Sequence, residues 1–321
     1  MASILVGSLA GCGNGADKTS SGTKDDKKPS VVTIGYQQIP NDEILAKSKN
    51  WYEKELGVKV KFVQFDSGKD VNTAMTSKSL DIALLGSTPA SIGISQNLPY
   101  EVFWIHDVIG KNEALVAKNK ANINSIKDLK GKKIGVPFGS NAQPLVYLYL
   151  EKAGLTEKDV EILNVAAADI PATIVKGDID AGVVWEPVLS VAAKEGNPVK
   201  LLATAEGIKY FVDPIIARSE FTEAHPEETA KLLRALNKAG EWSSENQQEA
   251  AEIVNKSTQV DLEALLITLS KKNLSSKIDQ EWTDAFVQGE KDALKYELLK
   301  KDIDVLGHIK TEYLKAAGLD K

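Results

Sequence analysis

The sequence predicts an α/β protein built from two similar lobes, and three observations support this. Segments rich in β-branched residues alternate with segments of helical periodicity, the pattern of parallel sheets covered by helices. The same order of segments recurs along the chain: Ile34 and Ile134 are 100 residues apart, and Asp81 and Asp180 are 99 apart. The chain of 321 residues is long enough for two units that each bury a core.

The first unit begins with a strand over 31–36, "VVTIGY", whose residues are apolar and mostly β-branched. A helix is expected from Asn41 or Asp42, because the apolar residues that follow lie on one continuous face. Gly57 is the expected end of this helix. Four further elements complete the unit. They are a strand over 58–65, a helix opened by Ser67 and Gly68, a buried strand at 80–86, and a helix with Pro89 in its first turn.

The second unit repeats this order, starting from the strand "KKIGVPFG" at 132–139. A helix over 142–153 is expected to end at Gly154, and a strand at 161–165 follows. Residues 167–190 then predict a helix, a strand and a helix opened by proline. From Pro226 onward the chain turns helical, and we expect these helices to pack mostly on the first lobe.

Composition excludes several classes of function. The net charge of −6 argues against nucleic-acid binding, which normally needs a basic surplus. A single cysteine excludes a disulfide framework and a cysteine-based zinc site, and the three histidines, His106, His225 and His308, lack metal-ligand spacing. No Walker A or GxSxG motif occurs, so neither a metal nor a cofactor is predicted.

The N-terminal segment predicts export and a lipid anchor. The apolar stretch 4–10 ends in small residues, as the apolar regions of secretory leaders do, and "LAGC" resembles the bacterial lipobox, whose cysteine is acylated. Cys12 is then the anchor, 1–11 the residual leader, and the polar segment 12–30 a flexible tether. The alternative is a disordered N-terminus with an incidental cysteine.

Several motifs resemble, in order, those of the solute-binding proteins of ABC importers. They are "FDSGKDV", "DIALLGSTPAS", "VFWIHDVIGKNEALVAK", "SIKDLKGKKIGVPFGS", "GDIDAGVVWEP" and "FTEAHPEETAKLLRA". They are most similar to the taurine and aliphatic sulfonate-binding family, and within it to the taurine branch. The resemblance covers residues 32–240 and, more loosely, the rest of the chain.

The resemblance implies a type II periplasmic-binding-protein fold that closes on a small solute and delivers it to an ABC permease without chemistry. The protein is then an extracytoplasmic monomer, held at the membrane only by its lipid anchor. The resemblance also implies the lobe boundaries: lobe 1 at 31–114 and 217–321, lobe 2 at 115–216, and crossover segments near 114–118 and 211–218. An enzyme similar to thiamine-pyrimidine synthase is disfavoured because that family needs a site rich in cysteine and histidine. A sensory subunit has no signalling domain to support it.

The candidate site lies where strands end and helices begin, because ligands of open α/β lobes bind there. A sulfonate suits the N–H groups of helix N-termini, and the chain has only two arginines, Arg218 and Arg234. We therefore expect backbone amides to bind the anion together with Ser87, Thr88, Ser140 and Asn141. These residues are equally suited to be simple helix caps.

Other candidate residues serve a zwitterionic ligand. Glu113 and Asp213 match acidic positions of the taurine branch, which implies that they bind the ligand's ammonium. Four aromatic side chains are expected to wall the cavity, together with Gln37; they are Tyr36, Trp104, Phe138 and Trp185. Trp104 is equally suited to the core, and Asp213 to a surface ion pair.

The sequence departs from the taurine branch at the anion end. That branch usually carries a Ser-Thr-Thr-His-Tyr run, whereas this chain has Ser140 followed by Asn-Ala-Gln-Pro at 141–144. The expected ligand is a taurine-like amino-sulfonate, and the alternatives are another small zwitterion or an anion such as nitrate or a carboxylate.

Overall fold

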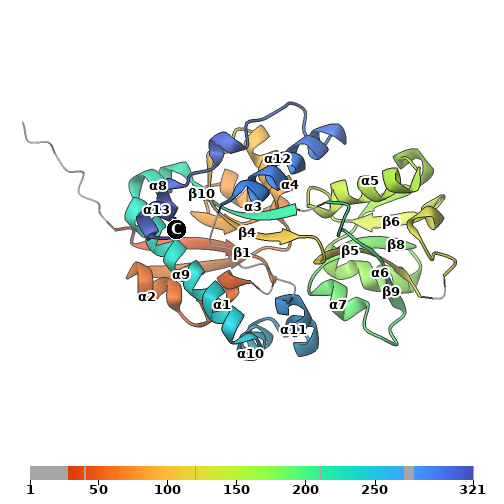
Figure 1. Ribbon diagram of the computed structural model, residues 1–321, viewed down its shortest axis with the longest axis horizontal. Coiled ribbons are helices and arrows are strands. Elements are labelled where there is room, and N and C mark those ends of the chain that lie inside the picture. The colour runs from red at the N-terminus through yellow and green to blue at the C-terminus, as the bar shows by residue number, and fades with distance from the viewer. Residues whose placement is uncertain (1–27, 40, 120, 210, 271–277, 321) are drawn as a thin grey trace, which may run out of the picture.

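The computed structural model describes residues 28–39, 41–119, 121–209, 211–270 and 278–320. Two lobes lie side by side along the long axis of the molecule, each built on a five-stranded sheet (Figure 1). The two-lobed α/β architecture predicted from the repeat is confirmed. Cys12, with the leader and tether predicted around it, lies outside the described residues.

The first sheet has the strand order β2-β1-β3-β10-β4. Strand β1 pairs in parallel with both β2 and β3, whereas β10 runs antiparallel between β3 and β4. Sequence-distant segments therefore meet at the centre of this lobe. The strands are β1 (Val31–Tyr36), β2 (Lys59–Gln64), β3 (Ile82–Leu84), β4 (Tyr100–Ile109) and β10 (Phe211–Arg218).

The second sheet has the order β7-β6-β8-β5-β9, which places its parallel and antiparallel pairs as in the first. Strand β6 pairs in parallel with β7 and β8, and β5 runs antiparallel between β8 and β9. The strands are β5 (Glu113–Lys118), β6 (Lys133–Val136), β7 (Glu161–Asn164), β8 (Ala181–Trp185) and β9 (Val199–Thr204).

The sequence repeat has a direct structural counterpart. The carboxylate of Asp81 accepts a hydrogen bond from the backbone N–H of Thr33 at 2.8 Å. In the second sheet, the carboxylate of Asp180 accepts a hydrogen bond from the backbone N–H of Lys133 at 2.9 Å. Asp81 thus ties the start of β3 to β1, and Asp180 ties the start of β8 to β6.

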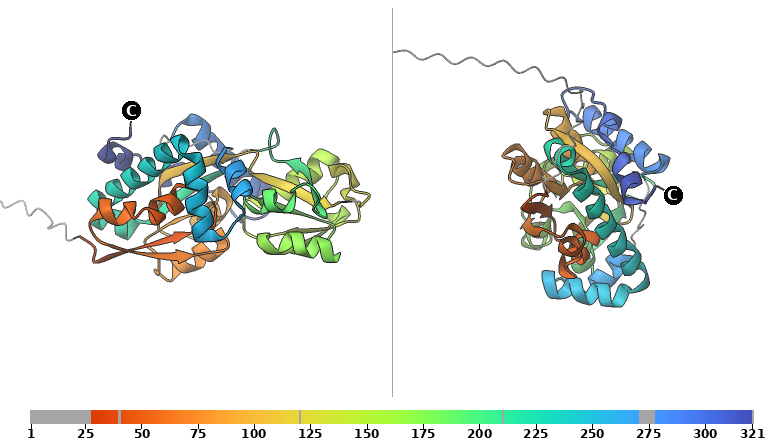
Figure 2. Two further views of the ribbon diagram at one scale, coloured as in Figure 1. Left: turned by 90° about the horizontal axis from the view of Figure 1, so that it is seen from below. Right: turned by 90° about the vertical axis from the view of Figure 1, so that its left-hand side faces the viewer.

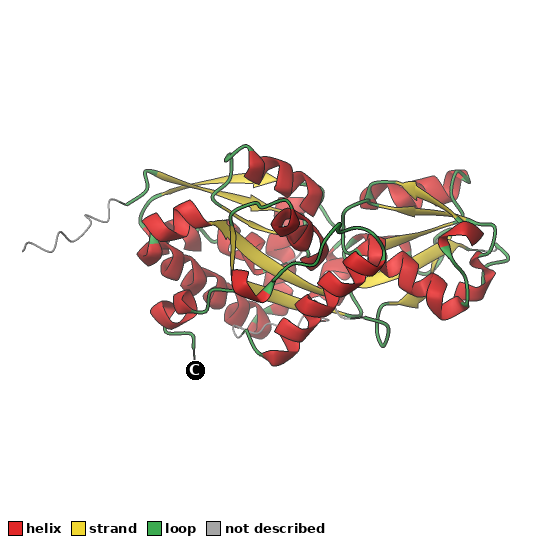
Figure 3. Ribbon diagram, turned by 90° about the horizontal axis from the view of Figure 1, so that it is seen from above, coloured by secondary structure: helices red, strands yellow, loops and turns green. Residues whose placement is uncertain are grey.

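Helices cover both faces of each sheet (Figures 2 and 3). In the first lobe one apolar core lies beneath the first two helices and α9, and another beneath α3, α4 and α12. Its helices are α1 (Asp42–Ser48), α2 (Trp51–Leu56), α3 (Gly68–Thr76), α4 (Ser87–Ser95), α8 (Ser219–Ala224), α9 (Pro226–Glu245), α10 (Gln247–Thr258), α11 (Leu262–Ser270), α12 (Gln280–Lys295) and α13 (Glu312–Ala317); the second lobe has α5 (Ala142–Ala153), α6 (Ile170–Lys176) and α7 (Val188–Ala192).

One predicted helix is divided in two. The apolar face over 42–56 predicted a continuous helix, but α1 and α2 are separated at Asn50. Asn50 adopts a left-handed conformation with φ 54°, which asparagine tolerates better than most residues and which interrupts a right-handed helix. The predicted ends at Gly57 and Gly154 are confirmed, both glycines being left-handed at φ 66° and 72°.

The chain passes between the sheets twice, and both passages lie a few residues before the expected segments. Residues 114–118 and 211–218 pair as parts of β5 and β10, and the described residues 110–112 and 205–209 belong to the connections. The C-terminal helices return to the first lobe, where α9 packs on α1 and α2 and α12 packs on α4. Among the described residues, none of the helices combines the length and the apolar character needed to cross a membrane.

Candidate functional site

A cavity of about 610 Å³ opens between the lobes at the ends of their parallel strands. The first lobe contributes the turn after β1 and the start of α3, and the second contributes the turns after β6, β7 and β8. Three predicted residues line it, namely Gln37, Phe138 and Trp185. The side chain of Gln37 also donates to the carbonyl of Leu84 at 3.5 Å, beside the N-terminus of α4.

The N-terminus of α4 is the best anion-binding group of the first lobe. Ser87 and Thr88 are fully buried there, and Thr88 Oγ1 has no hydrogen-bond partner among the described residues. Helix α12 packs directly behind this turn, because a Cβ built on Gly289 would lie 3.3 Å from Ser87 Oγ. The free N–H groups and dipole of a helix start attract negative charge.

Asn141 joins the two lobes at this point. It stands at the start of α5 in the second lobe, yet its Oδ1 accepts hydrogen bonds from Thr88 N–H at 2.9 Å and from the Ser87 hydroxyl at 3.4 Å. Its Nδ2 donates to Asp213 Oδ1 at 3.3 Å. The structure thereby brings together four of the predicted residues, which come from three distant parts of the sequence.

Two buried carboxylates lie beside this contact. Glu113, at the start of β5, is 2% exposed, and Asp213, in β10, is 8% exposed. Burial raises the pKa of Glu113 well above its ordinary value and the nearby charge of Asp213 raises it further, whereas Lys209 lowers it. Glu113 Oε2 has no hydrogen-bond partner among the described residues. One carboxylate oxygen of Glu113 is therefore available to a donor.

Lys209 was not predicted and lies close to this acidic pair. It sits on the second connection between the lobes, is 6% exposed and forms a close ion pair with Asp292 of α12. Burial lowers the pKa of Lys209, while Asp292 and Glu113 oppose that effect. Lys209 is therefore paired with Asp292 and also acts on the charge of Glu113. No local pattern could reveal this ion pair, whose members are 83 residues apart.

The remaining predicted residues lie outside this contact. Tyr36 donates through its hydroxyl to Gln64 Oε1 at 3.3 Å, and Lys47 Nζ lies 4.0 Å from its ring centroid. Trp104 is 3% exposed and packs within the core of the first lobe. Ser140 donates to the carbonyl of Pro137 at 2.7 Å, inside its own turn.

The anion end of the second lobe is partly used by the protein itself. Gln143, one of the residues that departs from the taurine branch, accepts a hydrogen bond from Gly139 N–H at 2.7 Å. Asn164 accepts another from Phe138 N–H at 2.9 Å. These two amides of the turn after β6 are thus already paired. Among the described residues, no three acidic, histidine or cysteine side chains gather as a metal site.

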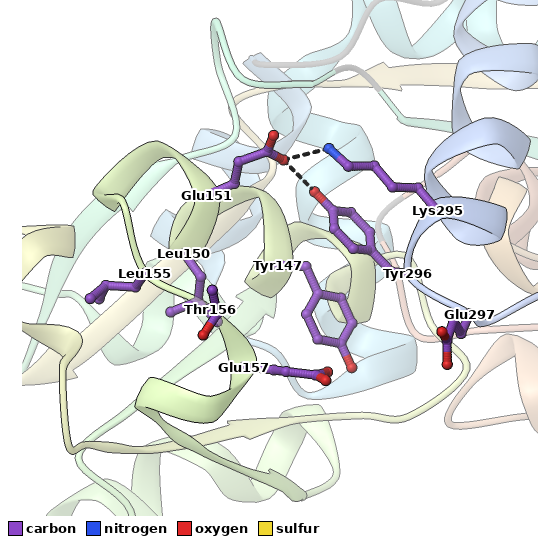
Figure 4. Close-up of a pocket in the computed structure, with 9 residues that line it drawn as sticks. All are labelled: Tyr147, Leu150, Glu151, Leu155, Thr156, Glu157, Lys295, Tyr296 and Glu297. Carbon is purple, nitrogen blue, oxygen red and sulfur yellow. Dashed lines mark hydrogen bonds and ion pairs between the residues drawn. The ribbon is translucent and has the colours of Figure 1, made fainter.

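A second contact between the lobes lies between α5 and the end of α12, beside a cavity of about 320 Å³ (Figure 4). The rings of Tyr147 and Tyr296 stack with centroids 4.9 Å apart and an interplanar angle of 28°. Glu151 accepts hydrogen bonds from Lys295 at 2.7 Å and from the Tyr296 hydroxyl at 2.8 Å. On another side, Lys194 of the second lobe pairs with Glu263 of α11 at 2.6 Å.

Known proteins resemble this chain over most of its length. A protein of Bacillus subtilis (strain 168), whose name assigns it to the binding of aliphatic sulfonates, is 30% identical over 302 residues, 92% of this chain and 88% of that protein. The taurine-binding periplasmic protein of Escherichia coli (strain K12) is 35% identical over 200 residues, 61% of each chain.

Solved structures and a family model agree with this. The alkanesulfonate-binding protein SsuA from Xanthomonas axonopodis pv. citri, bound to MOPS, superposes with a TM-score of 0.82 at 22% identity, covering 88% of this chain and 99% of that one. This confirms the predicted type II periplasmic-binding-protein fold. The sequence model described as NMT1/THI5 like matches residues 42–250. The resemblance seen in the motifs is thus confirmed, and the chain belongs to the NMT1/THI5-like family.

Proposed function

We propose that this protein is the extracytoplasmic solute-binding component of an ABC importer and that it captures a compact amino-sulfonate of the taurine type. The relatives named above are binding proteins for sulfonates or taurine, which supports a binding role without catalysis. The ligand enters the cleft between the lobes and shifts the population of their arrangements, and this shift reports loading to the permease.

One observation carries this proposal. The donors at the start of α4 and the carboxylate of Asp213 are spanned by a single side chain, with Thr88 N–H 2.9 Å from one end of the Asn141 carboxamide and Asp213 Oδ1 3.3 Å from the other. A ligand that satisfies both groups therefore needs an anionic oxygen and a donor nitrogen close together. Taurine has both, and Glu113 adds a second carboxylate for its ammonium.

A second candidate ligand is a zwitterion with a carboxylate head. The observation that favours it is the pairing of Gly139 N–H with Gln143, which removes an amide that a third sulfonate oxygen would use. Distinguishing the two requires β-alanine beside taurine, because these molecules differ only in the acid group. Nitrate then tests a plain anion.

The test is calorimetric titration of the purified chain with taurine, β-alanine, ethanesulfonate and nitrate. Taurine is expected to bind most tightly, and saturation at 1,000 times Kd adds about 4 kcal/mol to the free energy of unfolding. Asp213→Asn removes a charge-assisted hydrogen bond, so taurine affinity should fall about tenfold or more while ethanesulfonate affinity changes little. Equal losses for both ligands contradict the ammonium role, and no binding of either sulfonate contradicts the ligand class.

The anchor and location belong to the same proposal. A solute-binding protein that serves a permease must be held near it, and Cys12 within "LAGC" is suited to acylation. The chain is then an exported monomer tethered to the outer face of the cytoplasmic membrane. Mass spectrometry of the native protein tests this: a lipid-modified Cys12 at the mature N-terminus is expected, and an unmodified cysteine contradicts the anchor without affecting the binding function.

A further inference from the structure

The Asn141 carboxamide carries an acceptor oxygen and a donor nitrogen, which correspond in role to the anionic oxygen and the ammonium of a small zwitterion. Its oxygen accepts from Thr88 N–H and from the Ser87 hydroxyl, the donors suited to an anion. Its nitrogen donates to Asp213 Oδ1, a carboxylate suited to an ammonium. Asn141 comes from the second lobe and all three partners come from the first. One side chain of the second lobe thus forms hydrogen bonds with all three groups of the first lobe that are proposed to bind the ligand.

The packing around Asn141 shows that its carboxamide fits closely against Gly86. A Cβ placed on Gly86 would lie 2.5 to 2.6 Å from the carboxamide atoms of Asn141, closer than real Cβ contacts come. The backbone of Gly86 has φ −70° and ψ 161°, an extended conformation that any residue adopts. Glycine is therefore needed at this position for space and not for its backbone freedom. Asn141 itself is 5% exposed.

We infer that Asn141 is an internal substitute for the ligand: its carboxamide holds the lobes together in the unliganded protein and must leave when a solute enters. This inference rests on the proposed function for the identity of the competing solute. It differs from the direct anion contact expected of Asn141 from the sequence. An entering zwitterion replaces the oxygen at Thr88 and the nitrogen at Asp213 together, whereas a plain anion replaces only the first.

Competition of this kind lowers the apparent affinity for every solute. The binding-competent fraction of the protein is the fraction in which the carboxamide no longer contacts Thr88 and Asp213. The measured Kd is the intrinsic Kd divided by that fraction. Only the bond from Thr88 N–H, at 2.9 Å, has an ordinary length, and the other two are long at 3.3 and 3.4 Å. One ordinary hydrogen bond makes the reduction about three- to tenfold. Selectivity follows as well, because a plain anion does not replace the hydrogen bond from Asn141 Nδ2 to Asp213, whereas a zwitterion does.

The inference is tested with two variants and one control. Asn141→Ala removes the carboxamide. Gly86→Ala adds a methyl group at the position that the carboxamide occupies, without altering Asn141. The control is Asn246→Ala, which deletes an asparagine hydrogen bond to the carbonyl of Trp242, 2.8 Å long and confined to the first lobe. Small-angle X-ray scattering of the full, unliganded chain should give a larger radius of gyration for both variants and an unchanged value for the control. An unchanged radius in both variants overturns the inference.

Titration with taurine supplies the second readout. Asn141→Ala should bind taurine about three- to tenfold more tightly than the unaltered chain. Weaker binding by this variant shows that Asn141 contacts the ligand and overturns the inference, while leaving the proposed function intact. If taurine and ethanesulfonate bind neither chain, the proposed function fails, and the scattering result alone still decides whether Asn141 holds the lobes together.

Discussion

At the scale of single residues, the site combines the N-terminus of α4 with the buried carboxylates of Glu113 and Asp213. Thr88 Oγ1 and Glu113 Oε2 are buried without hydrogen-bond partners among the described residues, and unpaired buried polar atoms are costly in a folded protein. Such atoms are explained when a ligand supplies their partners. Glu113 is the more informative of the two, because its protonation can be followed.

The titration of Glu113 gives a prediction about stability. Its pKa is raised above the ordinary 4.5 by burial and by Asp213, so between 4.5 and the raised value the folded chain binds more protons than the unfolded one. The stability from this group is therefore complete below 4.5 and is lost as the pH rises through the raised pKa. The excess stability of the unaltered chain over Glu113→Gln should thus shrink as the pH rises.

Urea unfolding of the two ligand-free chains at a series of pH values measures this difference. Taurine should reduce the decline, because its ammonium stabilises the ionised carboxylate. If the free energies of unfolding of the unaltered chain and Glu113→Gln, both without ligand, change in parallel with pH, the pKa of the Glu113 carboxyl group is not raised by burial, and the prediction is contradicted.

At the scale of elements, α12 connects the two lobes. Its middle packs against the start of α4 through Gly289, Asp292 holds Lys209 on the connection between the lobes, and Tyr296 just past its end stacks on Tyr147 of α5. A single helix therefore contacts the start of α4, the second connection and the opposite lobe.

The stack between α5 and the end of α12 should be measurable as a coupling energy. A double-mutant cycle of Tyr147→Ala and Tyr296→Ala is expected to give about 1 kcal/mol, the usual value for an aromatic pair. The ion pair of Glu151 with Lys295 is more than half exposed on both sides and should add little. Chemical denaturation of the four chains measures the coupling, and a value near zero would show that the rings do not support each other in solution.

The same scale shows what the sequence can predict. The repeat was visible because Asp81 and Asp180 perform one local task in two similar lobes, and the helix ends at Gly57 and Gly154 follow from local backbone chemistry. The division of the first long helix at Asn50 was not predicted, because its apolar residues keep a continuous face across the break.

Long-range pairing was beyond the reach of local patterns. Ser87, Thr88 and Asp213 were identified from turns and family motifs, but their connection through Asn141 depends on how the lobes meet. The ion pair of Lys209 with Asp292 is equally non-local. Strand β10 was expected as a crossover, because its apolar run does not reveal that it returns between β3 and β4.

At the scale of the whole molecule, three separate contacts join the lobes within the part of the chain that the structure describes. The Asn141 bridge lies at the candidate site, the tyrosine stack lies between α5 and α12, and Lys194 reaches Glu263 from the second lobe to α11. Only the first of these uses groups that a ligand would also use. Ligand binding can therefore replace the central contact while the peripheral ones remain.

The most direct test of the account is a crystal structure of the chain grown with taurine. The account predicts a sulfonate oxygen within hydrogen-bond distance of Thr88 N–H, an ammonium in contact with Glu113 and Asp213, and an Asn141 carboxamide turned away from both. Taurine bound with its sulfonate far from α4, or an Asn141 bridge that persists beside the bound ligand, would contradict it.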